Sequence, residues 1–250
     1  RTVVTVDLLE RDPVRIESMF DELVPRYDLM NRVMTFGLDR SWRALAVRQL
    51  PTDIEGRALD LCCGTGDLTL ALAGAFPALD VVGVDFSTEM IAAARRKAAA
   101  WAQALEASPP QFVRGDALRL PFENDWFSVA TVGWGLRNVN DLAGVLSELL
   151  RVLRPGGRLV CLESTWPRER WARALHGVWM GYCVPALGSV VARQREAYSY
   201  LPASVQAFPR VDELAARMAR SGFNGVRYRS LGLRAVAIHV GDKPLVALSA

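Results

Sequence analysis

Short β-rich runs alternate with longer helical stretches through the middle of the chain, and this alternation limits the folds that the chain can adopt. The β-rich runs lie at 58–62, 81–85, 111–114, 128–132 and 158–162. The helical patterns between them lie at 67–74, 88–106, where Ser87 is the N-cap, and 141–153. Strands that alternate with helices pair in parallel through right-handed crossovers. The sequence therefore predicts an α/β fold with a doubly wound, Rossmann-like sheet.

The flanking segments also carry secondary-structure signals. Apolar residues recur at helical spacing over 14–35, where Pro25 should kink the helix and Gly37 should end it, and a short helix should follow from Asp39. A helix over 211–221 and two β-rich runs at 225–230 and 235–240 are expected near the end. Because no repeat or linker interrupts the chain, we expect a single domain over 1–250. Its parts would be a helical cap at 1–50, a core at 56–163, a lid at 164–210, and a closing helix and hairpin at 211–250.

Charge and cysteine content exclude several classes of protein. Thirty Lys and Arg residues against 27 Asp and Glu residues give a net charge of +3. The densest basic triplet, Arg95–Lys97, is predicted to be the solvated face of a helix, so we expect no nucleic-acid partner. The cysteines show neither metal-site nor disulfide spacing, which favours a reducing, cytoplasmic compartment and no bound metal. Adjacent Cys62 and Cys63, if they lie in a strand, should point to opposite faces.

An uncharged stretch at 174–192 approaches the length that spans a bilayer. Gly177, Gly181, Pro185 and Gly188 interrupt it, and both residue types weaken helices. We therefore predict a broken, partly buried lid rather than a membrane span. The start of the sequence has no apolar run behind basic residues, so no signal peptide is expected.

The turn after the first predicted strand carries the pattern Gly64-Thr65-Gly66. Glycines there let the backbone bend sharply and approach a ligand without an intervening Cβ. Ligands of doubly wound sheets bind beyond the carboxyl ends of the strands. A simple tight turn explains a lone Gly-x-Gly equally well, so this pattern needs support from elsewhere.

Two further strand ends supply that support. Asp85 ends the second strand, 19 residues after Gly66, where a carboxylate can accept hydrogen bonds from ribose hydroxyls. Phe86 is expected to pack on an adenine, and Asp116, with Ala117, should lie near the adenine amine. A carboxylate stabilised only by a helix N-terminus is the alternative interpretation of Asp85. Together these strand ends predict a nucleoside site.

The glycine turn favours S-adenosylmethionine over a dinucleotide. A dinucleotide fingerprint carries a third glycine three residues after the second, so that helix and strand pack around a pyrophosphate. This chain has Leu68 and Thr69 in that region, and Asp67 places a negative charge where the pyrophosphate would lie. Repulsion of a diphosphate and tolerance of a sulfonium both point to S-adenosylmethionine, bound by the core at 56–163.

Motifs along most of the chain form a recognisable set. They are Leu59 to Asp67, Val84 to Ser87, Gly115 to Ala117, Leu120 to Phe122, Gly135 to Val139 and Arg151 to Gly157, with Met19 to Asp21, Tyr27 to Asn31 and Phe36 to Trp42 before them and Tyr198 to Ser204, Phe208-Pro209 and Ala237 to Gly241 after them. This set resembles the UbiE/MenG family, the C-methyltransferases of menaquinone, ubiquinone and phylloquinone synthesis. The resemblance covers residues 15–245, and Gly-Leu-Arg-Asn and Tyr-Asp-x-Met-Asn are its most specific motifs.

The resemblance implies a seven-stranded methyltransferase sheet whose last strand runs antiparallel. It also implies cofactor contacts from Thr65, Asp85, Asp116 and Ala117. Gly133 stands where the family often has a serine, so only its backbone is expected to contact the cofactor. Asp39 and Thr35 replace a frequent His and Ser. The segment Gly232–Arg234 replaces a Thr-Gly-Gly segment, and its bulkier residues are expected to reshape the mouth of the substrate site.

Arg137, in the loop after the fourth strand, is predicted to be catalytic. Methyl transfer from a sulfonium is an in-line displacement, so positioning and charge stabilisation supply most of the catalysis. An ionised quinol hydroxyl pushes electron density onto the adjacent ring carbon, and a permanently charged guanidinium can stabilise that phenolate while a water takes the proton. An arginine that only ties its loop to a helix end is the alternative. Tyr27 and Asn31, four apart on one helix face, and Asn138 are the predicted substrate contacts.

Several alternatives remain open at this stage. The leading hypothesis is S-adenosylmethionine-dependent C-methylation of a prenylated quinol, demethylmenaquinol to menaquinol. The same fold could methylate another aromatic or secondary metabolite, as Gly232–Arg234 suggests, or the chain could be a non-catalytic cofactor-binding subunit. A hydrophobic substrate suggests peripheral membrane contact through the lid. The sequence does not indicate the oligomeric state.

Some aromatic and histidine side chains have two interpretations. His239 is predicted to be structural, and His176 has no obvious partner. The residues that either line an entry for a polyprenyl tail or belong to the core are Trp134, Trp166, Trp171, Trp179 and Met180.

Overall fold

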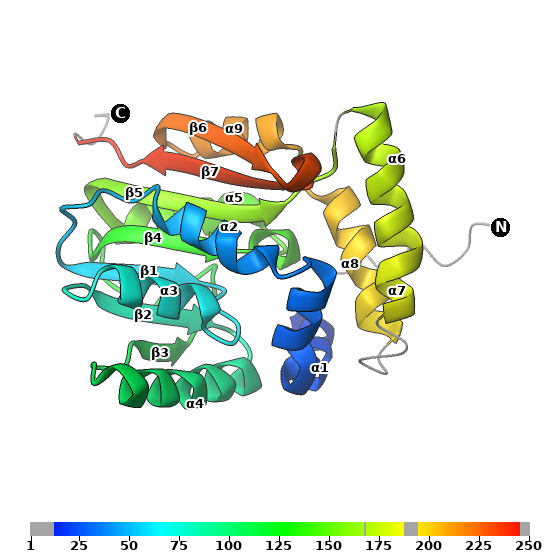
Figure 1. Ribbon diagram of the computed structural model, residues 1–250. Coiled ribbons are helices and arrows are strands. Elements are labelled where there is room, and N and C mark those ends of the chain that lie inside the picture. Colours follow the sequence, from blue (N-terminus) through cyan, green and yellow to red (C-terminus); the bar gives the residue numbers. More distant parts are fainter. Residues whose placement is uncertain (1–12, 168, 188–194, 246–250) are drawn as a thin grey trace.

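The computed structural model describes residues 13–167, 169–187 and 195–245, and its centre is a seven-stranded sheet (Figure 1). The strands are β1 (Arg57–Leu61), β2 (Asp80–Asp85), β3 (Gln111–Arg114), β4 (Phe127–Gly133), β5 (Leu153–Ser164), β6 (Asn224–Leu231) and β7 (Val236–Asp242). Their order is β3-β2-β1-β4-β5-β7-β6, and β7 runs antiparallel to both of its neighbours while the other pairs are parallel. The predicted doubly wound sheet with an antiparallel last strand is confirmed.

Helices cover both faces of this sheet. They are α1 (Pro13–Met34), α2 (Leu38–Val47), α3 (Asp67–Ala75), α4 (Thr88–Leu105), α5 (Leu142–Val152), α6 (Arg170–Val178), α7 (Val184–Leu187), α8 (Arg195–Ala207) and α9 (Val211–Arg220), with short turns η2 (Leu136–Asn138), η3 (Trp179–Cys183) and η5 (Gly232–Arg234). The helices α2, α3 and α4 pack on one face, and α5 and α9 pack on the other. Successive side chains of a strand point to opposite faces of the sheet, so β1 contributes to the core on both faces. Leu59 and Leu61 face α5, while Ala58 faces α2 and α3.

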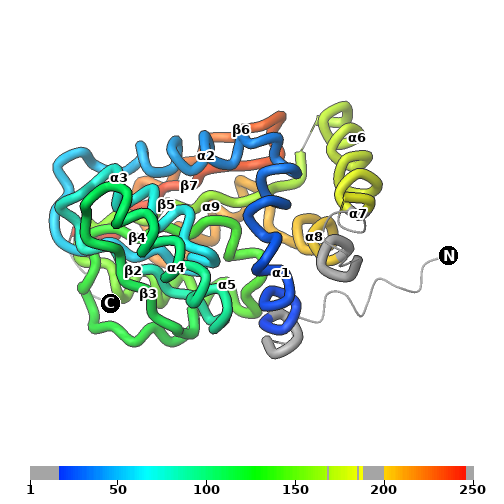
Figure 2. The backbone as a smooth tube through the Cα atoms, turned by 60° about the horizontal axis from the view of Figure 1, so that its bottom comes forward, coloured from blue at the N-terminus to red at the C-terminus, as the bar shows by residue number. Residues whose placement is uncertain are grey.

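The helices α1, α7 and α8 pack together at the end of the sheet where the parallel strands terminate (Figures 1 and 2). Leu23 and Met30 of α1 meet Met180, Val184 and Val205, and all five side chains are buried. Burial of such side chains stabilises the fold by about 1.5–3 kcal/mol each. The predicted first helix is therefore one wall of the region in which a doubly wound sheet binds its ligands.

The lid is continuous where the sequence predicted a broken segment. The elements α6, η3 and α7 follow one another without a gap from Arg170 to Leu187. Gly177 and Gly181 lie inside them with open space at their Cβ positions, so they weaken the helix without ending it. The irregularity is the π-helical turn η3. Gly188 lies outside the described residues, and no helix within them is long and apolar enough to cross a bilayer.

Two other predictions are corrected by the fold. β5 already pairs with β4 at Leu153, and pairing resumes at Arg158, so the expected turn at 155–157 is an irregularity within the strand. The prediction that Arg95–Lys97 is a solvated face is confirmed for Arg95 and Arg96, which are exposed, and wrong for Lys97, which is half-buried. Arg95 donates to the carbonyl of Phe112, and Lys97 forms ion pairs under α1.

The turn η5 holds three successive residues with positive φ, of which Leu233 (φ 53°) is exposed. A left-handed conformation costs a non-glycine residue about 1–2 kcal/mol. We therefore predict that Leu233→Gly raises the free energy of unfolding by about 1 kcal/mol. Urea unfolding checks this, with Leu105→Gly as the control. Leu105 is equally exposed but helical, so its replacement should lower the stability by about 1 kcal/mol. A lower stability for Leu233→Gly would contradict the prediction.

Candidate active site

The side chain of Asp85 joins the carboxyl ends of β1 and β2. Its two oxygens accept hydrogen bonds from the backbone N–H groups of Gly64 at 2.8 Å and Ser87 at 3.0 Å. Burial raises the pKa of the Asp85 carboxyl, although these hydrogen bonds act in the opposite direction. Each carboxylate oxygen has a further acceptor position. Asp85 therefore fixes the glycine turn and still offers acceptors to the hydroxyl groups of a ligand.

A cavity of about 240 Å³ opens beside this carboxylate. The predicted residues that line it are Tyr27, Gly64, Asp85, Phe86, Asp116, Ala117, Gly133 and Asn138. Asp116 is held in place because its Oδ1 accepts a hydrogen bond from the backbone N–H of Leu118 at 2.9 Å. No Lys or Arg belongs to the described lining. Two carboxylates among apolar walls suit a nucleoside, whereas the same two negative charges, with no cation beside them in the lining, would repel a pyrophosphate.

A second cavity, of about 470 Å³, adjoins the first. The residues that line both are Tyr27, Cys62, Gly64, Gly133 and Trp134. Trp134, Trp179 and Met180 line the larger cavity, as one of the two interpretations of these side chains predicted. Trp166 instead packs on His176, and Trp171 is exposed to solvent. The two cavities therefore meet at the glycine turn, and the larger one has mostly apolar walls.

Tyr27 lies at this meeting point. Its Cε1 is 3.8 Å from the position that a Cβ on Gly64 would take, so the ring lies against the glycine turn. Burial raises the pKa of the Tyr27 phenol, while the charge of Arg137 and a hydrogen bond with the Asn31 side chain lower it. Tyr27 and Asn31 both line the larger cavity. Asn138, predicted to contact the substrate, lines the smaller one, where its Oδ1 accepts from the Tyr200 hydroxyl at 3.3 Å.

Arg137, in η2, forms part of the wall of the larger cavity and is anchored by Glu163 at the end of β5. Its Nη1 donates to Glu163 Oε1 at 2.8 Å and to the carbonyl of Trp134. Glu163 also accepts from the backbone N–H of Ser164 at 2.8 Å. Both charged side chains are buried, and Arg137 Nε has no hydrogen-bond partner within the described structure. The guanidinium is therefore fixed by a strand-end carboxylate and not by a helix end.

The two adjacent cysteines point to opposite faces of the sheet, as expected, although both lie just beyond the end of β1 at Leu61. Cys62, which has a left-handed conformation with φ 55°, packs against the core on the α5 face, and Cys63 packs against the core on the α3 and α4 face. Both cysteines also line the larger cavity. Burial raises the pKa of both thiols well above the usual range, so they stay protonated. Cys62 also explains the glycine of the Gly-Leu-Arg-Asn motif, because a Cβ on Gly135 would lie 2.3 Å from its Cβ.

Asp60 is a site residue that the prediction missed. It is fully buried in β1, lines the larger cavity, and accepts hydrogen bonds at 2.7 Å from the hydroxyls of Thr69 and Thr131. Burial raises the pKa of Asp60 to about 6, against the effect of these two hydrogen bonds. Its position in the motif from Leu59 to Asp67 was the available signal, but nothing in the sequence shows that it is buried.

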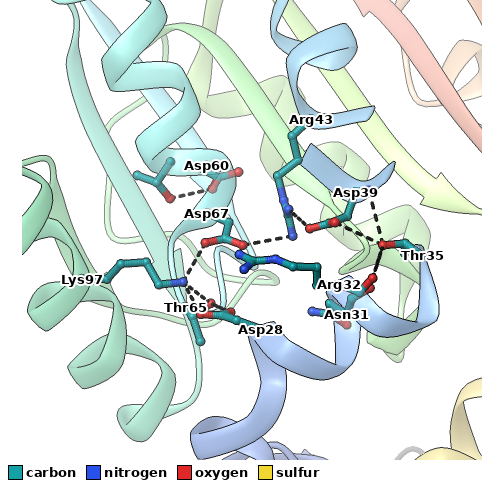
Figure 3. A network of polar contacts seen from close by, with 11 residues as sticks. Asp28, Asn31, Arg32, Thr35, Asp39, Arg43, Asp60, Thr65, Asp67 and Lys97 are labelled. Atoms are coloured by element: carbon teal, nitrogen blue, oxygen red, sulfur yellow. Dashed lines mark hydrogen bonds and ion pairs between the residues drawn. The ribbon is translucent and has the colours of Figure 1, made fainter. Parts of the chain in front are cut away.

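A polar network ties the N-terminal helices to the glycine turn (Figure 3). Lys97 of α4 contacts Asp28 at 2.5 Å and Asp67 at 2.7 Å. The Thr65 hydroxyl donates to Asp28 at 2.6 Å and accepts from Lys97 at 3.0 Å. Arg43 of α2 lies 2.5 Å from Asp39 and 3.3 Å from Asp67. These contacts hold α1 and α2 against the site, and residues that are distant in sequence supply them.

This network changes two predictions about the turn. Burial disfavours the ionised form of Asp67, yet Arg43 and Lys97 hold the pKa of its carboxyl below the usual value. Because two cations compensate Asp67, its charge does not by itself exclude a pyrophosphate. Gly66 lines neither cavity. Its φ is 85°, and a Cβ there would lie 3.0 Å from the Phe112 ring, so it serves the turn and close packing.

The two histidines make none of the polar contacts described above. His239 Nε2 lies 2.8 Å from the carbonyl of Val211 and lines neither cavity, as expected for a structural histidine. His176 lines the larger cavity, but its Nε2 is buried and has no partner within the described structure. The described residues contain no cluster of three or more potential metal ligands.

Comparisons with solved structures agree with this architecture. A S-adenosylmethionine-dependent methyltransferase from Thermotoga maritima superposes with a TM-score of 0.62 at 19% identity, covering 90% of this chain and 99% of that one. A methyltransferase from Methanococcus maripaludis gives a TM-score of 0.62 at 17% identity, covering 92% and 96%. At these identities the similarity shows the fold alone.

Sequence comparisons reach further than fold. A demethylmenaquinone methyltransferase of Thermus thermophilus is 46% identical over 226 residues, which cover 90% of this chain and all of the relative. One from Bacillus mycoides is 36% identical over 231 residues, covering 92% and 96%. The profile of the ubiE/COQ5 methyltransferase family matches residues 9–243. This chain therefore belongs to the ubiE/COQ5 methyltransferase family and is an S-adenosylmethionine-dependent methyltransferase.

Proposed function

We propose that this protein methylates a ring carbon of demethylmenaquinol with S-adenosylmethionine, which gives menaquinol. The observation that carries the proposal is that two unlike cavities meet at Tyr27, Gly64 and Gly133. One has strand-end carboxylates and the size of a nucleoside, and the other is larger and mostly apolar. The relatives at 46% and 36% identity, which are named demethylmenaquinone methyltransferases, support this choice of substrate.

The residues of the smaller cavity fit the adenosine part of the cofactor. We assign the ribose hydroxyls to Asp85, and the adenine to Phe86, Asp116 and Ala117, all of which line that cavity. The backbones of Gly64 and Gly133 lie where the cavities meet, and Thr65 lines the adjoining wall. When bound, S-adenosylmethionine supplies an electrophilic methyl group. Gly66 is left out of this assignment because it lines neither cavity.

Arg137 is proposed to stabilise the phenolate oxygen of the substrate. Its guanidinium lies on the wall of the larger cavity, anchored through Nη1, so it cannot turn away from a bound ring. A phenolate in apolar surroundings gains more from a fixed cation than it would in water. Tyr27 and Asn31 of α1, which line the same cavity, are proposed substrate contacts. A water carries the phenolic proton away, because an arginine does not act as a base at neutral pH. After methyl transfer the ring carbon loses its hydrogen as a proton and the phenolate oxygen takes up a proton, which gives the aromatic quinol with one proton released in total.

We propose that a lid covers the larger cavity and that the enzyme contacts the membrane peripherally. We assign residues 164–210 to a lid within a single domain, since α6, η3 and α8 supply side chains to the larger cavity. A quinol with a polyprenyl tail resides in a bilayer, so the enzyme must meet its substrate at a membrane surface. Peripheral contact satisfies this requirement.

A second candidate substrate class is favoured by one observation. Leu233 lines the larger cavity at the position where the bulkier Gly232–Arg234 segment was expected to reshape the mouth. An aromatic compound with a different ring system would respond to that change in shape. Both candidates use the same cofactor and the same Arg137.

Incubation with S-adenosylmethionine and chemically reduced demethylmenaquinol should yield menaquinol, detected by mass spectrometry. The physical reason is the apolar cavity beside the proposed methyl donor. Catechol and a simple naphthol serve as controls and should react far more slowly. Methylation of these phenols without methylation of demethylmenaquinol would contradict the proposed substrate and support the second class.

Asp85→Asn should weaken binding of S-adenosylhomocysteine by about 1–3 kcal/mol, since it leaves buried polar groups without matched partners. Isothermal titration calorimetry measures this. Asp80→Asn is the matched control, because Asp80 is exposed at the other end of the same strand. Equal affinities for the two variants would remove Asp85 from the site.

Arg137→Lys should lower kcat by about 10²–10³-fold, because one fixed donor to a developing oxyanion is worth that much. The affinity for S-adenosylhomocysteine should stay unchanged. Arg158→Lys is the control. It alters the ion pair of Arg158, within β5, with Asp242 at the end of β7 and touches neither cavity, so its kcat should equal that of the wild type. A wild-type kcat for Arg137→Lys would refute the catalytic role.

A further inference from the structure

Exposed apolar side chains surround the mouth of the larger cavity. Phe36, Leu38, Leu175 and Leu233 all line this cavity, yet they are 75%, 46%, 55% and 61% exposed. A residue that both lines a cavity and is largely exposed lies where the cavity opens to solvent. These four come from three segments that are distant in sequence.

Two side-chain contacts place the three segments around one opening. The ring of Phe36 lies 4.8 Å from that of Trp179, which joins the end of α1 to η3. Arg234 of η5 forms an ion pair with Glu169, which precedes α6. We call residues 31–42, 169–183 and 231–235 the mouth surface. Trp171, Val178 and Tyr182 extend it along α6 and η3, each more than half exposed.

The charge of the mouth surface has one sign. The exposed charged residues of its segments are Arg40, Arg170, Arg173 and Arg234, together with Arg32, whose side chain points toward Asp67 of the polar network (Figure 3). Within the same ranges, the acidic residues are Asp39, which is buried against Arg43, and Glu169, which is half-buried and pairs with Arg234. Because the whole chain carries nearly as many acids as bases, this separation is local to the cavity mouth.

We propose that the mouth surface docks on an anionic lipid bilayer, so that the larger cavity opens directly into the membrane. Exposed Trp, Phe and Leu side chains next to arginines are the composition of surfaces that lie in the bilayer interface. Each basic residue near an anionic surface contributes about 1 kcal/mol. The inference rests on the proposed function in one respect. A substrate whose tail stays in the bilayer gives the enzyme a reason to bind there.

The apolar rim and the cavity form one continuous surface, which distinguishes a membrane from a protein partner. A second copy of the chain would bury the same arginines against each other and would close the cavity. A bilayer neutralises the arginines with phosphates, takes up the apolar side chains, and keeps the entrance open to a prenyl tail.

The test is co-sedimentation of the full-length enzyme with vesicles of phosphatidylcholine, alone or with about 30% phosphatidylglycerol, an anionic lipid. The wild type should bind the anionic vesicles more tightly, and added salt should weaken this binding. The double variant Arg170→Glu with Trp171→Ser should bind at least about five-fold more weakly. Neither residue lines a cavity.

The matched control is Arg96→Glu with Leu105→Ser, the same pair of changes on exposed positions of α4, on the other side of the molecule (Figure 1). It should bind vesicles as the wild type does. With demethylmenaquinol in vesicles, kcat/KM of the mouth variant should fall at least about five-fold. With a water-soluble demethylated naphthoquinol that carries one isoprene unit, both variants should match the wild type.

The outcomes separate the two proposals. Methylation of the soluble quinol without preference for anionic vesicles, or with equal loss in both variants, would overturn the docking surface and leave the proposed function intact. Failure to methylate any demethylated quinol while the vesicle results hold would overturn the function and leave the surface. Concentration-dependent dimerisation that the mouth variant abolishes, without vesicle binding, would show a second copy as the occupant.

Discussion

The hydrogen bonds from Gly64 and Ser87 to the Asp85 carboxylate are the contact on which the site depends. They join the ends of two neighbouring strands, hold the glycine turn open, and place acceptors at the floor of the smaller cavity. Burial raises the pKa of this carboxyl because it disfavours the ionised form. The hydrogen bonds from the backbone N–H groups act in the opposite direction and stabilise the buried carboxylate. Both cavities take their shared boundary from this turn.

The N-terminal helices complete the site from outside the sheet. Lys97 compensates Asp28 and Asp67 at once, and the Thr65 hydroxyl links the same carboxylate of α1 to the glycine turn. The cavity for the substrate therefore exists only when α1 is in place, because Tyr27 is part of its wall. Buried and half-buried ion pairs of this kind specify how elements dock more than they add net stability. The site is thus shared between strand ends, which line the smaller cavity, and N-terminal and lid helices, which line the larger one.

The sequence predicted the sheet well because the physical signals are local. Hydrophobic runs such as Val81–Asp85 and the N-cap Ser87 act within a few residues, and the structure confirms both of them. The prediction failed where a distant partner decides the outcome. Asp67 was predicted to be an uncompensated charge, but Arg43 and Lys97 pair with it. The glycines of the lid were predicted to break it, but α6, η3 and α7 are consecutive, and Met180 and Val184 pack against Leu23 and Met30 of α1.

By itself, the sequence determined the order of strands and helices, the strand-end carboxylates, the family, and with it the cofactor and the type of reaction. Periodicity and motifs suffice for these because they depend on neighbours along the chain. Only the tertiary structure decided which side chains share a cavity: that Asp60 is buried beside it, that Glu163 anchors Arg137, and that Gly66 is left out. The physical reason is that burial and charge pairing are properties of the folded packing, in which residues far apart in the sequence exclude water from one another.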